Sequence, residues 1–291
     1  MATTTDLISS IKLQGSFPST DSLFSNQNYL SILDREQLAT LTPLLLKLNE
    51  EYFVTEKDYP VVANQSSYRI PKRAAGAQLR DVQLISTNGN VTGLTRLLED
   101  DRTSSASGPL GYYLKGNSVL LSPTPTTANG DVLRLLYVRR PSKFVLPIAC
   151  AQIISIDTAL NQIVVSSVPS TMTTATLVDF IQADSPYDLL QMDASIVGVS
   201  GTTISFSSLP TDLAVNDFIS LAGETCVPML PEELIVVLVQ AALCTCLSSK
   251  KDKSVELELQ KLEQLKTTFI EMLVPRVKSD DKRIVNKNSF F

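Results

Sequence analysis

The chain has 291 residues, a formal net charge of −5 and a pI of about 4.9. Surfaces that bind DNA carry a clustered excess of Lys and Arg, so this negative net charge disfavours a protein whose whole surface binds DNA. It is compatible with a protein through which DNA passes. Hydrophobic residues make up 44% of the chain, which excludes a disordered tail protein. The length suggests two domains, or one domain with a large insertion.

The first ten residues, MATTTDLISS, lack the basic and apolar regions of a secretory signal. The most apolar run, Leu234 to Leu247, spans about 14 residues, which is too short to cross a bilayer. Four cysteines are too few for a disulfide framework. We therefore expect a protein that has no membrane partner and is made in a reducing cytoplasm.

Residues 1–24 are rich in Ser and Thr and have a weak apolar pattern, so we expect a flexible N-terminal arm. Residues 25–55 repeat apolar side chains at steps of three and four, the spacing of one helix face. Ser25 suits the N-cap, and Pro43 should kink or split the helix because it removes one backbone donor. The sequence therefore predicts a long kinked helix after the arm.

Residues 56–147 consist of short β-branched or aromatic segments separated by Gly, Pro, Asn and Asp, a pattern typical of strands. The segment Lys115 to Ser118 lies between two such runs and predicts a hairpin turn. We expect a central β-rich region here.

Residues 148–228 contain an internal repeat. Two copies of a three-strand pattern follow one another, and in them Ile163 corresponds to Ile204 and Phe180 to Phe218. Two such units can pair into a small barrel or sandwich in which every strand edge is covered. The segment is therefore expected to form a β domain inserted into a larger fold.

Residues 229–274 predict two helices joined by a polar turn, which complete a helical core. The first of these helices is apolar almost all round, so its own domain or other subunits must cover several of its sides. Residues 275–291 are basic and poorly patterned and should form an extended tail. The whole predicts an α+β fold: a long N-terminal helix, a C-terminal helical hairpin, a central β region with an inserted barrel- or sandwich-like domain, and extended terminal arms.

The chain contains no histidine, which excludes Ser-His-Asp and Cys-His catalysis and His-ligated metals. Its acidic pairs lie at helix ends or in polar loops, where solvated surface is the simplest interpretation. Cys244 and Cys246 are two residues apart and face different sides of a helix, which disfavours a zinc site. Cys150 and Cys226 lie at the two necks of the insertion and could pair in a disulfide. We expect no catalytic residue, cofactor or metal.

The stretch Tyr68 to Ile85 reads YRIPKRAAGAQLRDVQLI and leaves two interpretations open. Lys72, Arg73 and Arg80 could contact phosphate, but the lone Gly76 does not make a phosphate-binding loop. A structural corner whose charges meet acidic neighbours, within one subunit or across an interface, is the simpler interpretation. The candidates for a subunit interface are Arg73, Arg80, Val237 and Leu238.

Several ordered motifs carry a family resemblance. They are LLLKLNEEYFVTEKDYPV followed by SYRIPKRAAGAQLRDVQLI, then GYYLKGNSVLLSPTP and GDVLRLLYVRRPSKFV, and finally LVPRVKSDDKRIVNKNS after two helices. With these motifs the chain resembles the head-to-tail connector (adaptor) proteins of tailed bacteriophages. The resemblance covers residues 25–147 and 228–289, and it is weakest between Cys150 and Cys226.

The resemblance implies a structural virion protein in the neck, assembled in the host cytoplasm as a homo-oligomeric ring, usually of twelve subunits, beneath the portal. Such a ring would extend the DNA channel, help retain the genome and dock the tail or further neck proteins, while double-stranded DNA passes without sequence-specific binding. It also implies that the C-terminal tail reaches into clefts of the portal. The tail residues concerned are Arg276, Lys278, Lys282, Arg283, Ile284, Val285, Lys287, Phe290 and Phe291.

Two other classes of function remain as alternatives. The first is a tail or fibre-attachment component whose β domain binds a receptor or carbohydrate. Sugar sites usually need exposed aromatic faces, and this segment has few aromatic residues and no tryptophan. The second is an enzyme such as a lytic hydrolase, against which the absence of histidine argues.

Overall fold

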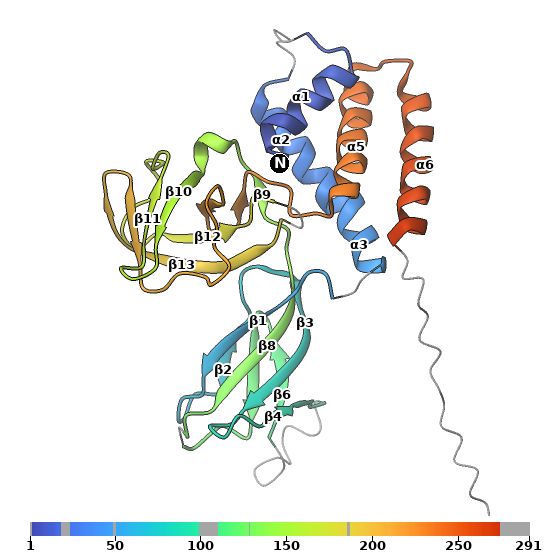
Figure 1. Cartoon of the computed structure of the whole chain (residues 1–291). Coiled ribbons are helices and arrows are strands. Elements are labelled where there is room, and N and C mark those ends of the chain that lie inside the picture. The colour runs from blue at the N-terminus through green and yellow to red at the C-terminus, as the bar shows by residue number, and fades with distance from the viewer. Residues whose placement is uncertain are drawn as a thin grey trace, which may run out of the picture.

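The computed structural model describes residues 2–18, 24–48, 51–98, 110–127, 129–184 and 187–273. The fold is mixed α+β and has three parts: helices gathered at one end, a β-barrel beside them, and two small sheets at the other end (Figure 1). The expected α+β class, the C-terminal helices and the inserted barrel are confirmed. The expected long N-terminal helix is wrong.

Helix α1 (Thr4–Gln14) occupies most of the segment that the sequence predicted to be a flexible arm. Thr3 caps the helix, since its side chain accepts from the backbone N–H of Asp6 while the Asp6 carboxylate accepts from Thr3. The buried face carries Leu7, Ile8 and Ile11, and it packs against the helical core. The arm prediction fails here because the Ser/Thr content concealed a capping box followed by an apolar face.

The long kinked helix predicted over residues 25–55 is divided in the structure near Pro43, where the sequence predicted a kink or a split. Helix α2 (Asn26–Glu36) is followed by the π-helical segment η1 (Gln37–Leu41) and helix α3 (Thr42–Leu48). Pro43 lacks an N–H, and its ring would crowd the carbonyl of Ala39 in a regular α-helix. The wider π turn just before it relieves that crowding, so a short α-helix follows instead of one continuous helix.

Helix α5 (Glu232–Lys250) is the centre of the helical part, and α6 (Val255–Leu273) packs along one side of it as the predicted hairpin (Figure 1). By length and composition alone α5 could cross a membrane, being longer than the apolar run counted in the sequence. However, 67% of its most apolar window is buried inside the chain. Its apolar surface is therefore explained by contacts with α1, α2 and α6.

The central region contains two four-stranded sheets that share one apolar core. Tyr68 and Val119 from one sheet and Val82 and Leu133 from the other are buried together. The predicted hairpin turn is confirmed, because Lys115 pairs with Ser118 across two turn residues. The first sheet has the order β1 (Val54–Pro60), β8 (Val132–Arg139), β3 (Ala74–Ile85) and β4 (Val91–Gly93). The second has the order β2 (Ser67–Arg69), β7 (Ser118–Ser122), β6 (Gly111–Lys115) and β5 (Thr95–Arg96).

The barrel is closed, so each of its strands has two neighbours and no edge is free. Its core contains apolar side chains from all six strands, with Phe180 and Phe206 in edge-to-face contact at 4.9 Å between ring centroids. The strand order is β10 (Ala151–Asp157), β11 (Gln162–Val165), β14 (Thr203–Phe206), β13 (Leu189–Ser200), β12 (Leu177–Ile181) and β15 (Phe218–Leu221).

The internal repeat explains how the barrel closes. Each copy supplies three strands, and two of the three equivalent pairs, β11 with β14 and β12 with β15, are neighbours in the barrel. Ile163 lies opposite its equivalent Ile204 in the β11–β14 pair. Similarly, Phe180 lies opposite Ile219 and Ile181 opposite Phe218 in the β12–β15 pair. The two copies are therefore related by an approximate two-fold axis, as two equivalent halves of one barrel.

A short connecting segment, here called the barrel neck, joins the barrel to the helices. Strand β9 (Lys143–Phe144) pairs in parallel with β16 (Glu224–Thr225), and the 3₁₀ turn η3 (Pro147–Ala149) leads into β10. The backbone N–H of Phe144 donates to Asp34 of α2 at 2.7 Å. The Thr4 hydroxyl donates to the carbonyl of Val145, also at 2.7 Å. Helices α1 and α2 thus each form a hydrogen bond with the barrel neck.

Candidate functional site

The stretch Tyr68 to Ile85 forms a corner between the two central sheets. Strand β2 ends at Arg69, and the backbone N–H of Ala74 donates to the carbonyl of Pro71 at 3.0 Å, which closes a tight turn. Strand β3 begins at Ala74 but shifts register before Leu79. Gly76, with φ of 57°, takes a left-handed conformation inside this irregular stretch, where glycine is free of the strain that a side chain would add. The proline and glycine therefore shape the corner.

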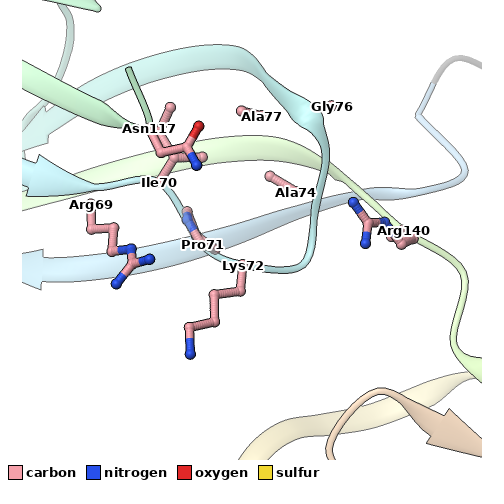
Figure 2. A pocket seen from close by; sticks show the side chains of 9 residues that line it. All are labelled: Arg69, Ile70, Pro71, Lys72, Ala74, Gly76, Ala77, Asn117 and Arg140. Atoms are coloured by element: carbon pink, nitrogen blue, oxygen red, sulfur yellow. The ribbon is translucent and has the colours of Figure 1, made fainter. Parts of the chain in front are cut away.

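A pocket of about 310 Å³ opens at this corner, and Figure 2 shows the side chains around it. We call it the corner pocket. It is lined by Arg69, Ile70, Pro71, Lys72, Ala74, Gly76, Ala77, Asn117 and Arg140. Its three cations come from three segments: the end of β2, the turn, and the residue after β8. Since no carboxylate is among the lining residues, the pocket attracts anions.

Arg73 lies in the same turn but contacts the barrel instead of the pocket. Its guanidinium forms an ion pair with Asp179 of β12, and its Nε lies 3.6 Å from a carboxylate oxygen of Asp193 in β13. The Asp179 side chain is fully buried, and it also accepts from the backbone N–H groups of Gly223 and Asp193, each at 3.0 Å. Arg73 therefore connects the central sheets to the barrel through a buried, hydrogen-bonded carboxylate.

Arg139, at the end of β8, lies close to this ion pair. Burial, together with the neighbouring positive charge of Arg73, lowers the pKa of Arg139, while the charge of Asp179 opposes that shift. One guanidinium nitrogen of Arg139 lies 3.9 Å from the sulfur of Met229. Because Asp179 attracts both arginines, it balances positive charge at the junction between the sheets and the barrel.

The four residues proposed for a subunit interface lie in different places. Arg73 pairs with Asp179 inside its own chain, and Arg80 pairs with Glu51 at 2.6 Å. Val237 and Leu238 are fully buried in the helical core, so covering them requires no second subunit. The side chain of Arg80 is 39% exposed, which leaves it accessible to a partner. The structure does not bring these four residues together.

The four cysteines are buried free thiols. Cys150 and Cys226 lie in one buried cluster at the barrel neck, as the sequence suggested, and a hydrogen bond with the Cys150 thiol, reinforced by burial, raises the pKa of Cys226. Burial is also the main cause that raises the pKa of Cys246, to about 11. Among the described residues, no group of three or more Cys, Asp or Glu side chains is arranged to hold a metal.

The nine tail residues predicted to contact the portal lie outside the described residues. Sequence reasoning missed the carboxylates Asp179 and Asp193 that receive Arg73, and it missed Arg140 as the third cation of the corner pocket. One signal was present: the triplet Asp-Phe-Ile occurs in both copies of the repeat, with Asp179 inside β12 and Asp217 directly before β15. An acidic residue repeated next to buried apolar residues indicates a required hydrogen-bonding or charged partner.

The fold and site define a mixed α+β protein with a helical end, a basic corner and a barrel joined through a buried ion pair. Residues 35–165, a little under half of the chain, match the model of the family described as SU10 adaptor protein. This match supports the resemblance to phage adaptor and connector proteins, and it overlaps the first of the two segments that carry that resemblance. No curated protein matches the chain.

Proposed function

We propose that this chain is a head-to-tail adaptor: a structural, non-enzymatic virion protein that forms a ring beneath the portal, extends the DNA channel, helps retain the genome and docks the tail. The observation that carries the proposal is the match of residues 35–165 to the SU10 adaptor family. A ring of twelve copies in the neck, assembled in the host cytoplasm, follows from the family resemblance. The net charge of −5 suits a conduit, because excess negative charge repels the DNA phosphates and keeps the duplex from adhering.

The proposed ring does not depend on Arg73, Val237 or Leu238, because Arg73 pairs with Asp179 of its own chain and the other two are buried in the helical core. Arg80 remains a candidate for contact between subunits, since its pair with Glu51 is exposed and exposed ion pairs contribute little to stability. Residues 275–291 are proposed to dock on the portal. Their basic and apolar side chains supply two kinds of contact for a groove on a partner.

Deleting residues 276–291 should give a folded protein that no longer joins portal-containing heads. The deletion leaves the described helices and sheets intact, so the circular dichroism spectrum should match that of the full chain. The measurement is complementation of phage lacking this protein, followed by counting of heads with attached tails. As a finer test, Lys278, Lys282, Arg283 and Lys287 are replaced by Gln in one variant, and Ile284, Val285, Phe290 and Phe291 by Ser in another. If the truncated protein still produces complete virions, the docking role of the tail is wrong.

A further inference from the structure

The corner pocket carries a local positive charge on an acidic chain. Arg69, Lys72 and Arg140 are all exposed, and within the described ranges none of their side chains forms an ion pair. This is unusual beside Arg73 and Arg80 of the same stretch, which both pair with carboxylates of their own chain. The three cations are therefore available to a ligand from outside the chain.

The shape of the pocket limits the size of that ligand. The pocket is concave, and its volume of about 310 Å³ is at the small end of the range for ligand sites. Beside the cations, the lining includes Ile70, Pro71, Ala74, Ala77 and Asn117, all labelled in Figure 2, and of these Pro71 and Ala77 are partly exposed. Apolar surface beside cations suits an anionic group carried on an aliphatic stem.

The backbone around the pocket is held by hydrogen bonds to neighbouring turns. The N–H of Ile70 donates to the carbonyl of Asn117 at 2.9 Å, and the N–H of Arg140 donates to the carbonyl of Arg73 at 2.7 Å. The second of these bonds links the pocket to the ion pair with Asp179, because Arg73 makes both contacts. The three cations thus project from a fixed frame, which lowers the entropy lost when a ligand binds.

We propose that the corner pocket is a docking site for a short acidic segment of a partner protein, with Arg69, Lys72 and Arg140 receiving two or more carboxylates. Arg presents a planar fork of donors that matches a carboxylate, and Glu carries its carboxylate on a stem that can lie on the partly exposed Pro71 and Ala77. Duplex DNA fits less well. The backbone of a duplex is convex, and proteins usually contact it along a stripe of basic residues. Here the three cations line one small pocket, and the net charge of the chain is −5.

Which protein supplies the acidic segment rests on the proposed function. In a ring, the nearest protein is a second copy of this chain, which is itself acidic. Binding of an acidic peptide by the isolated chain does not depend on that proposal. The tail deletion concerns residues 276–291, and peptide binding concerns the corner pocket. The two tests can therefore fail separately.

The test measures fluorescence anisotropy of labelled hexaglutamate, hexaglutamine and a short DNA duplex against the purified full-length chain at low salt. We expect hexaglutamate to bind and hexaglutamine not to bind. The single variants Arg69→Gln, Lys72→Gln and Arg140→Gln should each weaken binding about two- to fivefold, and the triple variant at least about tenfold, with a loss of affinity as salt is added. All three side chains are exposed, so the variants should keep the wild-type circular dichroism spectrum.

The matched control is Lys253→Gln, which removes the same charge from the exposed turn between α5 and α6. It should leave hexaglutamate affinity unchanged. The proposal is overturned if hexaglutamate binds no better than hexaglutamine, or if Lys253→Gln weakens binding as much as the pocket variants. It is also overturned if the duplex binds more tightly than hexaglutamate and loses affinity in the same three variants, because the pocket would then be a nucleic-acid contact.

Discussion

Replacing Arg73 with Met is expected to lower the free energy of unfolding by about 3–5 kcal/mol. The substitution keeps much of the side-chain length but leaves the Asp179 carboxylate fully buried without its ion-pair partner. The two backbone N–H groups that Asp179 accepts from stabilise the carboxylate in part, as does the nearby charge of Arg139. They do not replace a direct charge pair. Urea unfolding followed by circular dichroism measures the effect, since the chain has no tryptophan.

Two variants make this result specific to the buried pair. Arg80→Met breaks an exposed ion pair in the same stretch and should cost no more than about 1 kcal/mol. Arg73→Met combined with Asp179→Leu removes both charges, and it should recover part of the stability that Arg73→Met loses. An Arg73→Met protein within about 1 kcal/mol of wild type would show that the ion pair does not hold the barrel to the sheets.

Replacing Asp217 with Ala is expected to lower the free energy of unfolding by about 1–3 kcal/mol. Asp217 is 3% exposed, and its carboxylate accepts from the backbone N–H of Ala183 at 2.9 Å and of Ala214 at 2.8 Å. Without the carboxylate, the buried N–H of Ala183, just after β12, loses its acceptor, which costs about 1–3 kcal/mol. The N–H of Ala214 lies in an exposed loop, where water can replace the acceptor. The barrel should therefore unfold at a lower urea concentration.

The control for Asp217 is Asp157→Ala. The Asp157 carboxylate also accepts from two backbone N–H groups, those of Ala159 and Leu160, but in an exposed turn. Water can replace the lost acceptor there, so we expect a loss of about 1 kcal/mol or less. Equal losses in Asp157→Ala and Asp217→Ala would contradict the assignment of Asp217 as a buried structural carboxylate.

The barrel could be predicted because its strand pattern occurs twice in the sequence and depends only on neighbouring residues. Ile163 and Ile204 occupy the same place in two copies of one pattern, and a pattern of three short strands cannot cover its own edges. Pairing the copies closes the barrel, as the opposition of Ile163 and Ile204 shows. Likewise, the turn between Lys115 and Ser118 follows from turn chemistry that involves only neighbouring residues.

The features that sequence reasoning missed depend on contacts between distant parts of the chain or on subtle local geometry. Asp179 lies 106 residues from Arg73, so no local pattern could pair them. The cations of the corner pocket come to line one pocket only after β8 returns beside β3, which brings in Arg140. The π turn before Pro43 and the capping box at Thr3 were readable in principle. A kink or split at Pro43 was expected, but not the π turn that produces it, and the Ser/Thr content of residues 1–24 concealed the capping box.

The central claim, that this chain forms an adaptor ring between portal and tail, is tested most directly by electron cryomicroscopy of the virion neck. We expect a closed ring whose subunits fit the six-stranded barrel, the paired sheets and the helices α5 and α6, directly below the portal. The tail residues 276–291 should lie against portal density in each subunit. A virion in which these subunits occur only in fibres or in the capsid shell, with no ring of them at the neck, would contradict the claim.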